Sequence, residues 1–148
     1  MLSETEAAWL SGFIDGEGHV GLHPQRQSTR TYYQAVVYIR HTHMPTVEWV
    51  RDLVARLAID VNIVPMAAES VRHKNSFRLY ITGMDRILRL ADAVEPYSVT
   101  KIEQWAIVRE YCELRLASAG SRSGYTDREL ELAEAGGMMN RRGPVAGL

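Results

Sequence analysis

The sequence predicts a single α+β domain whose elements follow the order helix, strand, strand, helix, strand, strand, helix, with additional helices after them. Two patterns support this order. At Gly18 the spacing of apolar residues changes from helical to the alternation of a strand, and each of two pairs of alternating segments is followed by residues at helical spacing. The chain has 148 residues, of which 46% are hydrophobic, which is enough for one domain with its own core.

The first helix is expected to begin after Ser3, which stands three residues before Glu6 in the spacing of a capping box, and to end near Asp15. Three small residues lie along one side of this helix: Ala8, Gly12 and Gly16. Because residues at i, i+4 and i+8 share one side of a helix, another helix can approach this side closely. The two glycines weaken the helix by roughly 1 kcal/mol each relative to alanine, so we expect the small side to pack against a partner.

The exit from this helix carries a candidate metal ligand. Glu17 is flanked by glycines and follows a helix C-terminus, where free carbonyl groups carry partial negative charge. A carboxylate beside carbonyl oxygens is an environment that Mg²⁺ accepts when phosphate oxygens and waters complete the coordination. If two copies packed through their small sides about a two-fold axis, the two Glu17 carboxylates would lie together, and two metals could serve two phosphodiesters.

The remaining elements follow from apolar periodicity. We expect strands over 19–27, 31–41, 59–66 and 75–82, and helices from Pro45 and over 84–94, 99–117 and 126–139. In each strand apolar residues alternate with polar ones, so one face of the sheet is expected to join the core and the other to face solvent.

The net charge of the chain and the charge of two of its segments lead to opposite expectations about nucleic-acid binding. A net charge of −1 and a pI of about 6.5 argue against a nucleic-acid-binding protein. However, residues 18–47 and 70–84 contain no acidic side chain, although both windows contain arginine and histidine. A surface built from these two windows is therefore expected to be cationic.

Lys101 is expected at the N-terminus of a helix, an end that disfavours cations. Its position suggests a role other than helix stability, and the alternative is a solvated surface lysine. His41 and His43 form an H-x-H pair that could ligate a transition metal. This second site is disfavoured because no third or fourth ligand is evident nearby.

Residues Leu10 to Gly18, which read L-S-G-F-I-D-G-E-G, resemble the signature of the LAGLIDADG homing endonucleases. The departures are Ser11 for alanine, Phe13 for an aliphatic residue, Gly16 for alanine and Glu17 for aspartate. The resemblance covers roughly residues 3–117 and implies helices on one face of a curved antiparallel sheet, whose other face follows the major groove of duplex DNA. It also implies a homodimer that hydrolyses both strands of a long pseudo-palindromic site with Mg²⁺, for which Mn²⁺ substitutes.

The resemblance implies a role for particular residues. Glu17 and the carbonyl of Gly16 would bind the metal, and Lys101 would border the scissile phosphate. His41 would organise solvent near the nucleophile, with Thr42 and His43 as alternatives because the register is open by a residue or two. The dimer interface would comprise Ala8, Gly12, Asp15 and Gly16. The DNA contacts would comprise His19, His23, Gln25, Gln27, Arg30, Tyr32, Gln34, Tyr38, Arg40, Arg72, Lys74, Ser76, Arg78, Tyr80, Arg141 and Arg142.

We expect a core domain over residues 1–117, a flexible connector over 118–125 and a C-terminal helix and tail over 126–148. Cys112 is the single cysteine, and Glu4 and Glu6 occupy a start without a basic segment before an apolar run. A cytoplasmic or organellar protein is therefore expected. The family usually resides in introns or inteins as a mobile element. Two rival functions share its fold: a maturase that binds intron RNA, and a DNA-binding regulator without catalysis.

Overall fold

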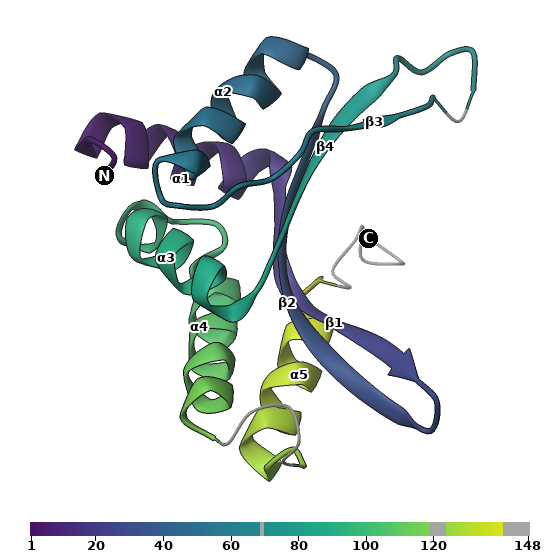
Figure 1. The fold of residues 1–148 in the computed structure, drawn as a ribbon, viewed down its shortest axis with the longest axis vertical. Coiled ribbons are helices and arrows are strands. Elements are labelled where there is room, and N and C mark those ends of the chain that lie inside the picture. The colour runs from purple at the N-terminus through teal and green to yellow at the C-terminus, as the bar shows by residue number, and fades with distance from the viewer. Residues whose placement is uncertain (69, 119–123, 141–148) are drawn as a thin grey trace, which may run out of the picture.

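The computed structural model describes residues 1–68, 70–118 and 124–140 (Figure 1). The elements are α1 (Glu4–Glu17), β1 (Gly18–Gln27), β2 (Arg30–His41), α2 (Met44–Ala55), β3 (Val64–Met66), β4 (Ser76–Thr82), α3 (Met84–Val94), the 3₁₀ turn η1 (Glu95–Tyr97), α4 (Ile102–Ala117) and α5 (Asp127–Asn140). The predicted order of helices and strands is confirmed. The strands form one antiparallel sheet in the order β1-β2-β4-β3, and the helices lie on one side of it (Figure 1).

The core lies between the sheet and these helices. Alternate residues of each long strand face it, among them Val20, Val37 and Leu79, which are at most 1% exposed. On the helical side Leu10 of α1 and Trp105 of α4 are fully buried. The alternation seen in the sequence therefore corresponds to a sheet with one apolar and one polar face.

The predicted strand over 59–66 is wrong in length, because only Val64–Met66 pairs with β4. Ile59 is fully buried and belongs to the turn that follows α2, where Ala58 adopts a positive φ of 59°. The apolar alternation from Ile59 onward thus reflects a segment that packs onto the core without a strand partner.

The C-terminal helix α5 packs on α4 and β1. It begins with a capping box in which Thr126 and Glu129 exchange hydrogen bonds, and Glu129 is buried beside Arg115 of α4, with Nη1 3.3 Å from Oε2. Most of the predicted connector, residues 119–123, lies outside the described residues, but its end is fixed: the Tyr125 hydroxyl accepts a hydrogen bond from the backbone N–H of Tyr33 at 2.9 Å. In the described parts of the chain, none of the helices combines the length and the apolar character needed to cross a bilayer.

Candidate functional site

The turn between α1 and β1 holds Glu17 in solvent. Glu17 is the last residue of α1 and is exposed. Gly18 follows at once, and its N–H donates to the carbonyl of Ile14. A Cβ at Gly18 would lie 2.9 Å from the oxygen of Ile14, so glycine lets the chain leave the helix this tightly and begin a strand. The local sequence therefore places a carboxylate at the corner where α1 meets the sheet.

Asp15 organises the other side of this corner. Its carboxylate accepts hydrogen bonds from the Ser98 hydroxyl at 2.7 Å and from the backbone N–H groups of Val99 at 2.7 Å, Thr100 at 3.0 Å and Lys101 at 3.3 Å. Asp15 was predicted at the dimer interface. Its side chain caps the turn that leads into α4 within the same chain, because this turn presents three backbone donors at the end of α1, and its place at an interface stays a prediction.

Lys101 lies against the end of α1, as the predicted site required. Its Nζ donates to the backbone oxygen of Asp15 at 2.5 Å, and the charges of Asp15 and Glu17 act on it. The N-terminus of α4 disfavours a cation, but the carbonyl groups at the C-terminus of α1 favour one. This arrangement explains why a lysine is tolerated at the N-cap of α4 and brings it to the same corner as Glu17.

The titration properties of this corner follow from burial and hydrogen bonding. Burial acts to raise the pKa of Asp15, but the hydrogen bonds from Val99, Ser98, Thr100 and Lys101 outweigh it and hold that pKa below its usual value. Burial lowers the pKa of Lys101, and the neighbouring carboxylates oppose this shift only in part. The corner therefore brings the carboxyl groups of Asp15 and Glu17 together with the amino group of Lys101.

The donor set at the corner fits a hard divalent cation that is bound partly by another molecule. Glu17 supplies an exposed carboxylate, and Gly16 lies in the last turn of α1, where carbonyl oxygens lack intrahelical donors. Within the described residues no three His, Cys, Asp or Glu side chains form a metal-binding group. One protomer therefore offers too few ligands for a closed site, but oxygen donors of this kind suit Mg²⁺ together with phosphate and water.

His41 lies on the core-facing side of β2, as predicted from strand parity. Its ring is 5.8 Å from the ring of Phe13, and its Nδ1 accepts a hydrogen bond from the backbone N–H of His43 at 3.0 Å. The rings of His41 and His43 stand 6.5 Å apart at 85°. Because Nδ1 of His41 is already engaged and the rings do not converge, the H-x-H pair does not form a two-histidine metal site here.

The register of the strands gathers the predicted DNA contacts of β1, β2 and β4 onto one face of the sheet. His19 lies opposite Tyr38, and Tyr38 lies opposite Tyr80. The His19 and Tyr38 rings stack at 4.8 Å, the two tyrosine rings stack at 6.0 Å, and the Arg78 guanidinium covers Tyr80 at 5.1 Å. Three further pairs extend this face towards the hairpin tip: His23 with Gln34, Gln25 with Tyr32, and Gln27 with Arg30.

One member of this face differs from the prediction. Ser76 was expected to be exposed, but it is only 5% exposed, and its Oγ accepts a hydrogen bond from Nε of Arg40 at 2.5 Å. It is therefore a support for Arg40 within the face. Val36 is fully buried although its register places it on the polar side, opposite Gly21. An apolar residue at this polar position indicates that another part of the protein covers Val36 and Gly21.

Asn140, at the end of α5, contacts β1 at Gly21. Its Nδ2 donates to the carbonyl of Val20 at 3.1 Å, and it occupies the space that a side chain on Gly21 would need. The predicted contacts Arg141 and Arg142 follow directly but lie outside the described residues. The last described residue of α5 is thus at the outer strand of the polar face.

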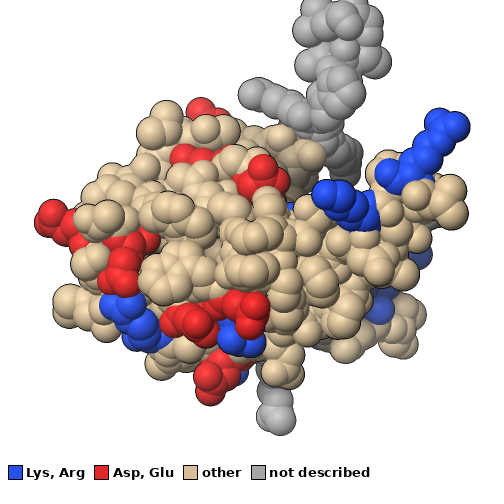
Figure 2. Space-filling view, turned by 90° about the horizontal axis from the view of Figure 1, so that it is seen from above, with Lys and Arg blue, Asp and Glu red and all other residues tan. Residues whose placement is uncertain are grey.

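The other end of the polar face is cationic. Arg40 and Arg78 lie directly opposite each other, and Nε of Arg78 is buried without a hydrogen-bond partner in the described parts of the chain. A pocket of about 300 Å³ opens beside them and is lined by Arg40, His41, Thr42, Ala68, His73, Lys74 and Ser76. Figure 2 shows Lys and Arg without acidic neighbours on the side towards which the hairpins extend, whereas red and blue side chains mix over the helices.

The small side of α1 is open. Ala8 is exposed, and a Cβ added at Gly12 or Gly16 would meet nothing within 4 Å. Two large apolar side chains are also exposed nearby: Trp9 on α1 is 40% exposed, and Val99 in the turn held by Asp15 is 80% exposed. Sequence analysis missed these two, although an exposed apolar surface of this kind marks a docking site.

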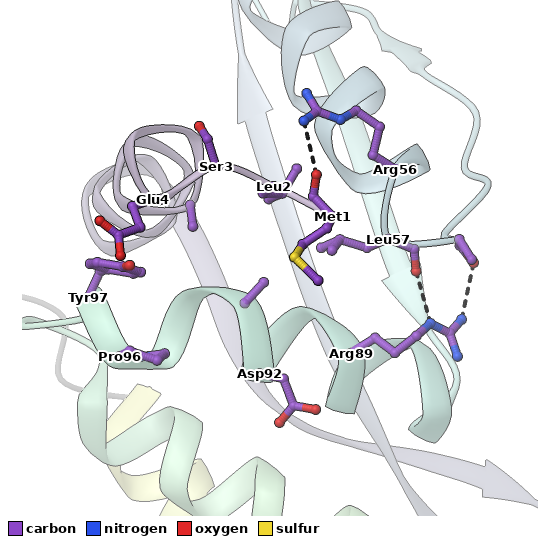
Figure 3. Close-up of a pocket in the computed structure, with 13 residues that line it drawn as sticks. Met1, Leu2, Ser3, Glu4, Arg56, Leu57, Arg89, Asp92, Pro96 and Tyr97 are labelled. Carbon is purple, nitrogen blue, oxygen red and sulfur yellow. Dashed lines mark hydrogen bonds between the residues drawn. The ribbon is translucent and has the colours of Figure 1, made fainter.

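A larger pocket, of about 610 Å³, lies at the opposite end of α1 (Figure 3). Arg56 and Arg89 line it, but both are used in the fold: Arg56 donates to Met1 and Glu6, and Arg89 donates to the carbonyl groups of Leu57 and Ala58. This pocket therefore lies away from the Glu17 corner and brings no pair of reactive groups together.

Comparison with known proteins agrees with this geometry. A family model described as a LAGLIDADG-like domain matches residues 4–95. The structure is similar to that of the homing endonuclease I-CvuI in complex with the I-CreI target in the presence of Mg, with a TM-score of 0.69, 14% identity and coverage of 95% of this chain and 85% of that chain. It is also similar to the archaeal intron-encoded homing endonuclease I-Vdi141I complexed with DNA, with a TM-score of 0.68, 15% identity and coverage of 95% and 87%.

The meganuclease I-SmaMI bound to uncleaveable DNA matches with a TM-score of 0.68 and 16% identity over 91% of this chain and 45% of that chain. No curated protein matches the chain in sequence. At such low identities the structural matches establish a shared fold, and the family model identifies the segment that contains Glu17.

Proposed function

Because this chain belongs to the LAGLIDADG family, we propose that it is a site-specific endonuclease that cuts double-stranded DNA as a metal-dependent homodimer. The observation that carries this proposal is the corner of Glu17, Asp15 and Lys101. An exposed carboxylate and an ammonium meet there at the end of a helix whose small side is open. The polar, cationic face of the sheet begins at the same corner.

In the proposed reaction each protomer contributes one Glu17 carboxylate, which would hold a divalent cation with help from the Gly16 carbonyl. When bound, Mg²⁺, or Mn²⁺ in its place, would supply positive charge that acidifies water and stabilises charge on the phosphate. Lys101 has three N–H donors, of which one is directed to Asp15. Its remaining donors can stabilise charge on the scissile phosphate, and His41 is proposed to orient solvent.

The proposed DNA contacts follow from the chemistry of the polar face. Arginine pairs with guanine edges, glutamine with adenine and aromatic carbon with the thymine methyl group. Arg40 and Arg78 are like charges at directly opposed positions, which is unfavourable in the free protein. A DNA anion between them would relieve this repulsion, so the same two residues would favour binding. The target is proposed to be long and pseudo-palindromic because two copies of this face would read it.

The homodimer is proposed from the exposed surface of α1. A helix approaching Gly12 and Gly16 meets no side chain, and it would cover the adjacent Trp9 and Val99. A two-fold axis along this surface would place two Glu17 side chains near each other. Each could then serve one strand of the duplex.

The test begins with the selection of a target. Duplexes that the protein cleaves are recovered from a randomised library and sequenced. A plasmid that carries this target should be linearised in Mg²⁺ and remain intact in Ca²⁺ or EDTA. Glu17→Gln should abolish cutting and preserve binding, because it removes the charge of the metal ligand without changing the sheet. Glu4→Gln, an exposed change at the other end of α1, is the matched control and should cut normally.

Binding of the plasmid without cutting in several divalent metals would contradict the nuclease and support a DNA-binding regulator. Preference for a structured RNA over the duplex would instead support the maturase. Loss of both cutting and binding in Glu17→Gln would contradict the assignment of cutting to the Glu17 corner and of DNA binding to the sheet.

A further inference from the structure

Two histidines of β1 meet on the polar face. His19 and His23 are four residues apart in a strand, so their Cα atoms are separated by about 13 Å. Nevertheless, their Nε2 atoms lie 2.7 Å apart, and their ring centroids are 4.7 Å apart. The rings therefore lean towards each other along the strand and cover the residue between them.

That residue is Gly21, and its lack of a side chain makes the contact possible. A Cβ at Gly21 would lie 3.0 Å from Nε2 of His19, closer than an ordinary van der Waals contact, and it would also meet Nδ2 of Asn140. The Tyr38 ring stacks on His19 and limits its rotation. The two ring nitrogens are thus held beside each other above Gly21, with an aromatic ring against His19.

A metal binds the neutral form of imidazole through the lone pair of a ring nitrogen. Two neutral imidazoles in contact share one Nε2–H and one lone pair. If the donor ring moves its proton to Nδ1, both Nε2 atoms present a lone pair, and no proton is released.

We propose that His19 and His23 form a binding site for a first-row transition metal such as Cu²⁺, Ni²⁺ or Zn²⁺, separate from the oxygen site at Glu17. Imidazole nitrogen suits these metals, whereas carboxylate and carbonyl oxygens suit Mg²⁺. Metal–nitrogen bonds of about 2.0 Å at adjacent square-planar positions place two nitrogens about 2.8 Å apart, and a tetrahedral Zn²⁺ places them about 3.3 Å apart. The observed separation of 2.7 Å already matches the first geometry.

The surroundings indicate the strength of the site. The described residues contain no group of three metal-ligating side chains, so water or another exchangeable ligand must complete the coordination. Lys101 acts electrostatically on His19 and opposes a second cation. Both features point to a site that exchanges its metal, unlike a structural zinc site with four protein ligands.

The test uses the untagged, full-length protein without DNA or Mg²⁺, so its result does not depend on the proposed nuclease activity. Calorimetric titration with Zn²⁺ and with Cu²⁺ should show one site per chain. The electron paramagnetic resonance spectrum of the Cu²⁺ form should show coupling to two imidazole nitrogens. Excess Mg²⁺ should not displace either metal.

Three variants locate the site. His23→Gln should weaken binding by about tenfold or more, since even loss of an outer-shell partner costs about 10–100-fold. Gly21→Ala keeps both histidines but inserts a methyl group against Nε2 of His19 and Nδ2 of Asn140, and it should weaken binding as well. His73→Gln, an exposed histidine in the loop before β4, is the matched control and should bind as the unchanged protein does.

Circular dichroism should confirm that the variants are folded. Equal affinity in His23→Gln and the unchanged protein would overturn the proposal, as would a Cu²⁺ spectrum with fewer than two imidazole nitrogens. The spectrum of the unchanged protein decides the matter even if a variant fails to fold.

Discussion

Removal of the Asp15 carboxylate should destabilise the protein and slow DNA cleavage at the Glu17 corner. Four hydrogen bonds reach this carboxylate. At roughly 1.5 kcal/mol for each bond to a charged group, the lower end of the usual range, the four bonds sum to about 6 kcal/mol. Val99 and Thr100 are exposed, so their N–H groups regain water when the carboxylate is lost. We therefore expect Asp15→Ala to lower the free energy of unfolding by about 3 kcal/mol.

Asp15→Asn should cost less. An amide oxygen in place of Oδ2 keeps the bonds from Val99 and Thr100, and the Ser98 hydroxyl can rotate to accept from the amide nitrogen. The bond from the Lys101 N–H is lost, together with the charge that strengthens the others. We expect a loss of about 1–2 kcal/mol.

Thermal and urea unfolding followed by circular dichroism would measure both changes. At about 2–4 °C per kcal/mol, Asp15→Ala should lower the Tm by about 6–12 °C. Because the pKa of Asp15 lies below its usual value of 3.8, its contribution is present above that pH and disappears as the pH falls through the lowered pKa. The difference between the variant and the unchanged protein should therefore shrink in acid.

Asp60→Ala, an exposed change outside these contacts, is the control and should stay within about 0.5 kcal/mol. If Asp15→Ala unfolds with the same free energy as Asp60→Ala, the capping role assigned to Asp15 is refuted. In a cleavage assay Asp15→Ala should also cut slowly while binding DNA normally, because Lys101 loses its support.

Three further outcomes are expected. Gly12→Leu should convert a dimer to a monomer in light scattering, since its side chain fills the open side of α1; a wild-type monomer would contradict the interface. Glu129→Gln should lower the free energy of unfolding by about 3 kcal/mol in urea, because it removes the charge beside the buried Arg115. Burial raises the pKa of the Cys112 thiol to about 12, so an aromatic disulfide reagent should modify Cys112 only after unfolding, and rapid modification of the native protein would argue against its burial.

Much of the site could be predicted because its signals are local. The helix cap at Ser3 is confirmed, and the alternation of β1 and β2 predicted which side chains share the polar face. Lys101 was singled out because a cation is unfavourable at a helix N-terminus, and the structure shows the compensating carbonyl of Asp15. Ser76 shows the limit of such reasoning: alternation places it on the polar face, but only the neighbouring Arg40 determines that it is buried.

The sequence by itself determined the order of the elements, the faces of the strands and the exposed carboxylate at the end of α1, because periodicity, caps and glycines act over a few residues. Only the tertiary structure decided that Asp15 caps a turn more than eighty residues away, that β3 pairs over just Val64–Met66, and that His19 and His23 touch across Gly21. These features depend on where distant backbone donors, strand partners and side-chain rotamers meet in space, which spacing along the chain does not encode.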